Sequence, residues 1–309
     1  MLIPSQNDSE VLECSNMTTH ISVLLEPAIH SLDIKPHDIV VDGTFGAGGH
    51  TARILESQHD VHVICVDLDE DAELRFKERF GYTTNVRFVH ANFKEAARIM
   101  QEGNVTTVHK VLLDLGTSTF QLLDDTRGFS FKSDSPLSMA FSQAGSHTGF
   151  NAYDIVNEWE ESSIADIIFG YGEERAARKI ARTIVAARAH GPITTSGALA
   201  DVIAAAIPRR GRIHPATKTF QALRIAVNDE LGVIKQALDA WWEVLAPGGR
   251  ISVITFHSLE DRIVKHWMIA QEHKRVITKK PIIPTDQELQ DNPRSRSAKL
   301  RTIEKEVSL

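Results

Sequence analysis

The feature that most constrains this chain is a glycine-rich turn between an apolar strand pattern and a helical pattern. The apolar run Ile39–Asp42 comes first, the turn follows from Gly43, and a short helical pattern begins near His50. Glycines let the backbone pass close beneath a ligand, and the next helix presents free N–H groups at its start. The turn therefore predicts an α/β unit with a ligand at the strand end, although a tight turn without a ligand is the alternative.

The spacing of the glycines narrows the type of ligand. Residues 42–49 read Asp-x-x-x-Gly-x-Gly-Gly, whereas a dinucleotide fingerprint, Gly-x-Gly-x-x-Gly, places its third glycine for close packing of the helix on the strand. The observed order is the arrangement of nucleoside-sulfonium sites. A nicotinamide-dependent dehydrogenase of the same fold is the rival interpretation that this spacing disfavours.

Further apolar runs extend the strand and helix alternation. Runs at 61–67, 86–89 and 108–115 are typical of buried parallel strands. Helical patterns then replace them, and apolar residues from Phe220 to Leu238 recur at the spacing of one long helix, which Pro247–Gly249 ends before a strand from Arg250. We expect the following division: a flexible leader at 1–19, a first sheet part at 20–118, an inserted helical domain at 119–213, and a second sheet part at 214–309 with a basic tail around 293–301.

Two carboxylates end strands at the edge where open α/β sheets bind ligands. Asp67 follows the glycines by about 20 residues, the position from which a carboxylate accepts both hydroxyls of a ribose. Asp114 ends the fourth strand and is either part of a site or a strand-end cap. Residues 69–71 are acidic and are interpreted as a solvated helix start. The Asp/Asn-Pro-Pro-aromatic motif of amino-methylating DNA enzymes does not follow Asp114, which counts against a DNA methyltransferase.

Composition excludes several classes of protein. The sequence contains no apolar run of about 18 residues and no signal-peptide pattern, so we expect a cytoplasmic protein. Its two cysteines are far apart, and no HExxH or paired Cys/His spacing is present, so no metal is expected. His257 lies just after a strand and is either a structural histidine or a group facing the ligand edge.

The formal net charge of −7 means that any nucleic-acid surface must be local. Basic residues form three clusters. Any one of them alone is interpreted as a solvated face, but three in one chain are what local phosphate binding requires. The three clusters are Arg175, Arg178, Lys179 and Arg182; Arg209, Arg210, Arg212 and Lys218; and Arg294, Arg296, Lys299 and Arg301.

Several ordered motifs resemble one enzyme family. They include 42–50, Asp114-Leu115-Gly116, 127–131 (Arg-Gly-Phe-Ser-Phe), 171–175 (Tyr-Gly-Glu-Glu-Arg), 214–224, 256–262 and 292–297. From His20 onward the chain resembles the RsmH/MraW family of 16S rRNA cytosine-N4 methyltransferases.

The resemblance implies a class I methyltransferase fold, with a Rossmann-like, mostly parallel sheet interrupted by a helical substrate-recognition domain. It implies S-adenosylmethionine as the methyl donor and cytosine 1402 of 16S rRNA, within the small ribosomal subunit, as the substrate of a monomer or homodimer. The donor-binding positions that it implies are Gly48, Gly49, His50, Asp67, Phe93, Asp114 and Gln121. Asp114 is our first candidate for the group that accepts a hydrogen bond from the cytosine amine, and His257 is the second.

The chain departs from the family pattern beside the expected cytosine pocket. Where the family has Gly-Pro-Leu-Asp-Met-Arg, residues 135–140 read Ser-Pro-Leu-Ser-Met-Ala, so Ser135, Ser138 and Ala140 replace a glycine, an acid and a base. Ser22, Pro27, Thr117, Thr119, Phe120 and Leu123 also depart from the pattern. These changes keep open a second interpretation, a donor-binding ribosome-assembly factor with weak or lost methyl transfer.

Overall fold

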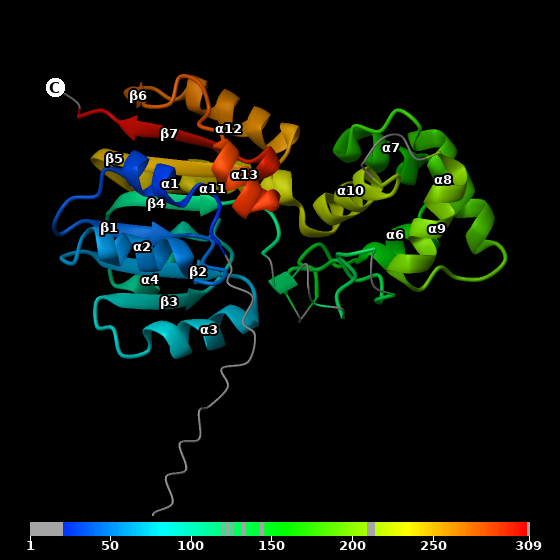
Figure 1. Ribbon diagram of the computed structural model, residues 1–309, viewed down its shortest axis with the longest axis horizontal. Helices are drawn as coiled ribbons and strands as arrows, with labels where there is room; N and C mark the ends of the chain where they lie inside the picture. The colour runs from blue at the N-terminus through cyan, green and yellow to red at the C-terminus, as the bar shows by residue number, and fades with distance from the viewer. Residues whose placement is uncertain are drawn as a thin grey trace, which may run out of the picture.

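The computed structural model describes residues 21–118, 120–121, 124, 126–131, 134–142, 145–208 and 214–307. The predicted leader lies outside these residues, as do Thr119, Leu123, Arg209, Arg210 and Arg212. Figure 1 shows two lobes, one built on a sheet and one built of helices. In the part of the chain that the structure describes, no helix combines the length and the apolar character needed to cross a membrane.

The sheet lobe is built on seven strands in the order β3-β2-β1-β4-β5-β7-β6. The strands β1 to β5 run parallel, while β7 runs antiparallel to both β5 and β6. The bounds are β1 Ile39–Asp42, β2 His62–Asp67, β3 Val86–His90, β4 Val108–Asp114, β5 Leu245–Thr255, β6 Lys274–Val276 and β7 Lys299–Lys305. The predicted mostly parallel α/β sheet is confirmed, and its first four strands lie where the apolar runs placed them.

Helices cover both faces of this sheet because its central strands are apolar on both sides. One face packs against α4, α11 and α12, and the other packs against α1, α2 and α3. The bounds are α1 Leu25–Leu32, α2 Gly49–Ser57, α3 Glu70–Phe80, α4 Ala96–Gly103, α11 Glu230–Val244 and α12 Ser258–Ala270. The side chain of Trp241, on α11, is fully buried and its indole N–H donates to the Phe93 carbonyl at 2.8 Å.

The helical lobe has a hydrophobic core of its own, centred on isoleucines of α7 and α8. Its helices are α6 Ala152–Glu158, α7 Glu161–Gly172, α8 Ala177–Arg188, α9 Ser196–Ala206 and α10 Thr217–Asn228. The α10 residues Phe220, Leu223 and Val227 belong to this core, so α10 packs with the helical lobe although the sheet lobe resumes directly after it (Figure 1).

The prediction of one long helix from Phe220 to Leu238 is wrong. The segment forms two helices, α10 and α11, and Asp229 between them has a left-handed backbone with φ 45°. Each half keeps its apolar spacing, so the pattern was correct within each helix but could not reveal the change of direction. The break sends α10 into the helical lobe and α11 onto the sheet.

The prediction of a basic tail is also wrong for most of its length. Residues 286–305 form α13 Asp286–Asp291, the 3-10 helix η1 Pro293–Ser297 and the strand β7. Lys299 and Arg301 both bind the carboxylate of Asp261, and Arg301 is buried. These two cations are therefore committed to the sheet lobe, whereas Arg294 and Arg296 are exposed.

Candidate active site

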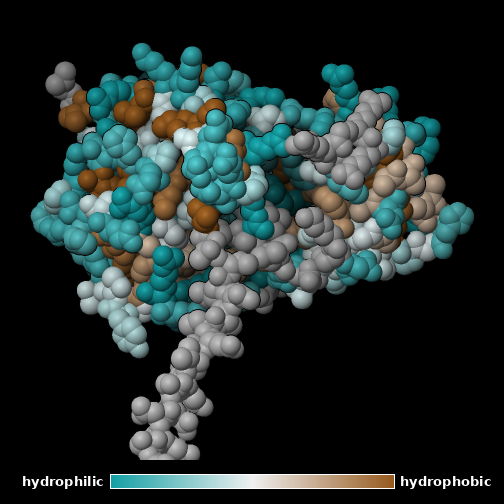
Figure 2. Space-filling view, in the orientation of Figure 1, coloured by the Kyte–Doolittle hydropathy of each residue, from teal (hydrophilic) through white to brown (hydrophobic). Residues whose placement is uncertain are grey.

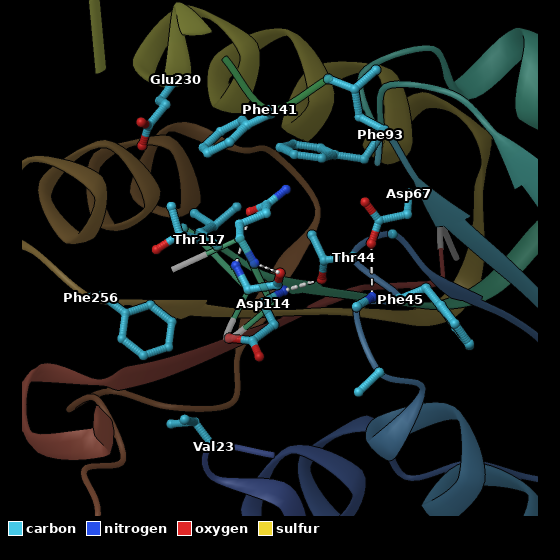
Figure 3. Close-up of a pocket in the computed structure, with 18 of the residues that line it drawn as sticks. Val23, Thr44, Phe45, Asp67, Phe93, Asp114, Thr117, Phe141, Glu230 and Phe256 are labelled. Carbon is cyan, nitrogen blue, oxygen red and sulfur yellow. Dashed lines mark hydrogen bonds between the residues drawn. The ribbon is translucent and has the colours of Figure 1, made fainter. Parts of the chain in front are cut away.

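A cavity of about 630 Å³ opens at the carboxyl end of the parallel strands. The glycine loop, the ends of β2 and β4, and residues of α10, α11 and η1 supply its walls (Figure 3). This is the edge at which open α/β folds bind ligands. The described lining residues include Gly49, His50, Asp67, Phe93, Asp114 and Gln121, so the structure brings six of the predicted donor-site residues to one place.

The glycine loop is shaped by Gly48, which itself is absent from the described lining residues. Its φ is +73°, and an added Cβ would lie 2.7 Å from the Phe45 ring and 2.8 Å from the Phe80 ring. Only glycine adopts this backbone conformation without strain and also lets the chain pass so close to the two rings. Gly48 caps α2, so the helix begins at the cavity with its free N–H groups directed toward a ligand.

Asp67 connects this loop to the end of β2. Its Oδ2 accepts from the Gly46 N–H at 2.8 Å and its Oδ1 accepts from the Asp69 N–H at 2.9 Å. Each carboxylate oxygen has a second lone pair, which leaves Asp67 able to accept from two ribose hydroxyls. Burial raises the pKa of this carboxyl to about 6, although the two backbone N–H groups lower it by stabilising the ionised form.

Asp114 lies at the centre of the cavity wall (Figure 3). Its backbone N–H donates to the Thr44 hydroxyl at 2.7 Å, which fixes the end of β4 against the glycine loop. Its Oδ1 is buried without a hydrogen-bond partner, and its Oδ2 lies 3.9 Å from Nδ1 of His50. Burial, with the nearby carboxylates of Asp42 and Glu260, raises the pKa of Asp114 well above its usual value.

His50 provides Asp114 with no cationic partner. The ring is buried, its Nε2 lies 3.2 Å from the Val23 carbonyl, and burial lowers its pKa to about 4. The imidazole is therefore neutral near pH 7. An unpartnered carboxylate oxygen that faces a cavity is costly unless a ligand completes it.

The remaining two predicted donor residues flank the same cavity. Phe93 follows β3, and the hydrogen bond from Trp241 fixes its carbonyl. Gln121 is buried, its Oε1 accepts from the Ser118 N–H at 3.0 Å, and its own N–H donates to the Ser118 hydroxyl at 3.1 Å. This reciprocal pair holds the loop that follows Asp114.

His257, the second catalytic candidate, is placed differently. It caps α12, where its Nδ1 accepts from the Glu260 N–H at 3.4 Å, while Oε2 of Glu260 accepts from the backbone N–H groups of Phe256 and His257. It is not among the described residues that line the cavity, although Phe256 and Glu260 are. Its predicted catalytic role stays a prediction, and the geometry shows a capping box.

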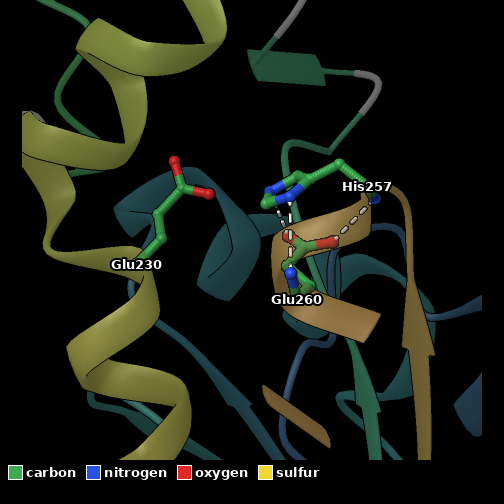
Figure 4. Close-up of side chains that lie close together, drawn as sticks. All are labelled: Glu230, His257 and Glu260. Atoms are coloured by element: carbon green, nitrogen blue, oxygen red, sulfur yellow. Dashed lines mark hydrogen bonds and ion pairs between the residues drawn. The ribbon is translucent and has the colours of Figure 1, made fainter. Parts of the chain in front are cut away.

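Glu230, His257 and Glu260 nevertheless lie close together (Figure 4), with one potential ligand atom of each within 4.8 Å of the others. Both oxygens of Glu230 are already bound by Arg224, at 2.7 Å and 2.9 Å. Nε2 of His257 lies 3.1 Å from Oε1 of Glu260. Among the described residues, however, Nε2 of His257 and Oε1 of Glu260 are both buried without a hydrogen-bond partner, and the expectation of a site without a metal stays a prediction.

The cavity is also lined by residues that the sequence did not assign to the site. They are Phe141, Arg224, Asn228, Glu230, Phe256 and Arg294. Asn228 holds the loop that carries Phe141, because its Oδ1 accepts from the Phe141 N–H at 3.0 Å and its Nδ2 donates to the Met139 carbonyl at 2.8 Å. Arg224 belongs to the 214–224 motif. Its position in the cavity depends on the break between α10 and α11, which the apolar pattern did not reveal.

The departures at 135–140 lie behind this wall rather than on it. Ser138 and Ala140 are not among the described lining residues, and Ala140 is buried. Phe141, the next residue, does line the cavity and is held by Asn228. Thr117 and Ser22, two other departures, line the cavity directly.

The charge of the cavity is suited to a cationic ligand. Burial raises the pKa of Asp42 to about 6, as it does for Asp67, and Asp114 is raised further. Burial is the main cause of these shifts, because it disfavours the ionised form of each carboxyl in or beside the cavity. A ligand with a positive sulfonium centre favours the ionised form of these carboxyls, and its ribose hydroxyls match the two acceptor oxygens of Asp67, so the residues present fit S-adenosylmethionine.

Comparison with known proteins decides the family. A sequence model of the MraW methylase family matches residues 17–306. The chain belongs to this family. A ribosomal RNA small subunit methyltransferase H from Nostoc punctiforme is 46% identical over 293 residues, which cover 94% of this chain and 95% of the relative. One from Clostridioides difficile is 44% identical over 309 residues, with 93% and 98% covered.

Solved structures were also compared with the chain. An rRNA methylase from Streptococcus thermophilus covers 93% of this chain and 99% of its own length, at 11% identity and a TM-score of 0.45. Membership of the MraW methylase family and the observed strand order together confirm the class I methyltransferase fold and S-adenosylmethionine as the cofactor. The nicotinamide-dependent rival is therefore excluded.

Proposed function

We propose that this MraW-family methyltransferase transfers a methyl group to N4 of a cytosine in the 16S rRNA of the small ribosomal subunit. The family and the names of the relatives support the substrate class. The observation that carries the chemistry is Oδ1 of Asp114, which is buried and unpartnered among the described residues on a side chain that lines the cavity.

S-adenosylmethionine supplies an electrophilic methyl group at this site. The N-terminal turn of α2, the Asp67 carboxylate and the Phe93 ring hold the donor in our proposal, and Gln121 keeps the loop after Asp114 in place. The exocyclic amine of cytosine is a weak nucleophile, so positioning and electrostatics must supply most of the rate enhancement. Asp114 supplies both, because Oδ1 accepts an N4–H hydrogen bond and takes the proton that the nitrogen loses as it is methylated.

The helical domain that we assign to residues 119–213 is proposed to recognise the RNA around the target. Arg175, just before α8, and Arg178, Lys179 and Arg182 on α8 are exposed, and they suit phosphate contacts. The target base must leave its surroundings to enter the cavity. We place this reaction in the cytoplasm, with the chain acting as a monomer or a homodimer.

The decisive experiment is methyl transfer from labelled S-adenosylmethionine to isolated small subunits, followed by digestion of the rRNA and identification of the methylated nucleoside. We expect N4-methylcytidine from the wild type. In single turnover, Asp114→Ala should be slower by about 100-fold or more, since acid–base groups contribute roughly 10²–10⁴-fold. Subunit affinity should be unchanged, because Asp114 lies away from the basic residues of α8.

Two results would contradict the proposal in different ways. Donor binding without transfer to any RNA would favour the assembly factor that the changes at Ser138 and Ala140 keep open. A normal single-turnover rate for Asp114→Ala would leave the reaction in place and overturn the role of Asp114.

A further inference from the structure

The end of the cavity away from the glycine loop has a polar group that the proposed reaction has not yet used. Arg224 is on α10 and Glu230 begins α11, on either side of Asp229. Nε of Arg224 donates to Oε1 of Glu230 at 2.7 Å, and Nη2 donates to Oε2 at 2.9 Å. This two-point contact fixes the plane of the guanidinium group as well as its position.

One edge of that guanidinium group remains available. Among the described residues, Nη1 of Arg224 has no hydrogen-bond partner, and Arg224 lines the cavity. The side chain is only 17% exposed, so most of the guanidinium group is shielded from bulk solvent. A guanidinium group stays protonated in proteins, which makes Nη1 a fixed donor of two hydrogens.

Arg224 and Asp114 line the same cavity. Burial has the largest effect on the pKa of each group, and the Glu260 carboxylate is close enough to both to raise each pKa. All three residues line the cavity. A planar base held with its amine against Asp114 lies in the cavity that Arg224 also lines.

We propose that Arg224 is a specificity-determining residue that reads the Watson–Crick edge of the target cytosine, with Nη1 donating to N3 and O2, and that Glu230 is its positioning residue. The inference rests on the proposed function and deepens it. Along this edge cytosine presents the N4 amine, then the N3 acceptor, then the O2 acceptor. Uracil presents an N3–H donor instead, which would face another donor and be rejected. Adenine has an amine beside an acceptor but no counterpart of O2.

A base analogue tests this contact directly. In 3-deazacytosine a C–H group replaces N3, so the acceptor is lost while the amine remains. Small subunits are reconstituted with 16S rRNA that carries cytosine or 3-deazacytosine at the methylated position. For the wild type we expect the single-turnover rate on the analogue to fall at least tenfold, in line with a lost hydrogen bond to a charged group.

The variant Arg224→Lys, tested on both bases, completes a double-mutant cycle between this residue and N3 of the base. It keeps a cation beside Glu230 but loses the planar fork, so it should be slow on cytosine and show little further loss on 3-deazacytosine. Glu230→Gln keeps Arg224 but loosens its orientation, and it should reduce the analogue penalty without changing S-adenosylmethionine affinity. Arg262→Lys is the matched control: this arginine pairs with Glu173 and is not among the described lining residues.

The outcomes separate this inference from the function on which it rests. If wild type and both variants show the same penalty on 3-deazacytosine, Arg224 does not contact N3 and the assignment is overturned. A wild type that reacts equally well with both bases overturns it without any variant, which keeps the test valid if Arg224→Lys does not fold. No transfer to cytosine by the wild type would instead refute the proposed function, and the assignment of Arg224 with it.

Discussion

At the scale of single residues, the donor site depends on Asp67. Its carboxylate orders the glycine loop through the Gly46 N–H and, in our proposal, accepts the donor ribose. Loss of hydrogen bonds to a charged group costs roughly 1.5–3 kcal/mol, so calorimetry on Asp67→Ala should show S-adenosylmethionine affinity lower by at least tenfold. Asp60→Ala is the control, because Asp60 is exposed and pairs with His37 away from the cavity. Equal affinity in wild type and Asp67→Ala would rule out the ribose contact.

The raised pKa values predict how donor binding depends on pH. Burial raises the pKa of Asp42 and of Asp67 from 3.8 to about 6. Because these folded-state values are raised, the contribution of the two carboxyls to stability is fully present below their unfolded pKa and is lost as pH rises through about 6. A bound sulfonium cation has the opposite preference, since it favours ionised carboxylates.

We therefore expect S-adenosylmethionine affinity to increase as pH rises from about 5 to about 7, across the folded pKa values of Asp42 and Asp67. Calorimetry at constant ionic strength measures this increase. S-adenosylhomocysteine has no sulfonium charge and is the matched control, so its affinity should change less over the same interval. The same pH dependence for both ligands would show that these carboxylates do not respond to the sulfonium centre.

The sequence predicted a site residue when its role followed from its position at the end of a strand. Asp67 and Asp114 were predicted because parallel strands bring their carboxyl ends to one edge. Arg224 and Glu230 were not, because residues six apart on one continuous helix do not face each other. Only the left-handed backbone at Asp229 brings them within 2.7 Å. His257 shows the converse, since this residue beside the site uses its Nδ1 to cap a helix, while its Nε2 has no hydrogen-bond partner among the described residues.

At the scale of elements, the turn between β1 and α2 depends on the conformation of Gly48. In Gly48→Ala the new methyl group would meet the rings of Phe45 and Phe80 in addition to adopting a positive φ. We expect a loss of about 1–3 kcal/mol in unfolding free energy, measured by chemical denaturation, and weaker donor binding. Gly145→Ala is the control, because its φ is also positive at +107° but no atom lies within 4 Å of its added Cβ.

The comparison between these two glycines separates backbone strain from collision. If both alanine variants lose the same stability, the Phe45 and Phe80 contacts are unimportant and the left-handed conformation alone requires glycine. A larger loss for Gly48→Ala, with weaker binding of S-adenosylmethionine, would show that the close approach of the turn to the two rings shapes the donor site.

Most helices and strands could be predicted because the spacing of apolar residues indicates which side of an element is buried. The four parallel strands and the β5 core were read from their apolar runs, whereas β7 was concealed by its charged residues. Lys299 and Arg301 in this strand bind Asp261, so their charges are paired inside the fold rather than displayed. Sequence patterns report which residues are polar, but not which partner from a distant element satisfies them.

At the scale of the whole molecule, an acidic protein must present its positive charge locally to reach RNA. The net charge is −7, and hydrophilic side chains cover most of both lobes on the face in Figure 2. Arg175, just before α8, and Arg178 on it are exposed and have no ion-pair partner among the described residues, while the Arg182 side chain lies 3.8 Å from that of Glu161. This surface suits phosphate contacts, and ion release would then make subunit binding dependent on salt.

The last prediction concerns this salt dependence. Each phosphate contact contributes about one unit or slightly less to the slope of log affinity against log salt. Changing Arg175, Arg178 and Arg182 to Ala should therefore weaken subunit binding and flatten the slope by up to about 3 units. The control changes Arg53, Arg98 and Arg275, which pair with glutamates on the sheet lobe, and alters net charge equally. If both triple variants gave the same slope, net charge alone would explain the effect, and RNA contacts would have to be sought around Lys218 and Arg294.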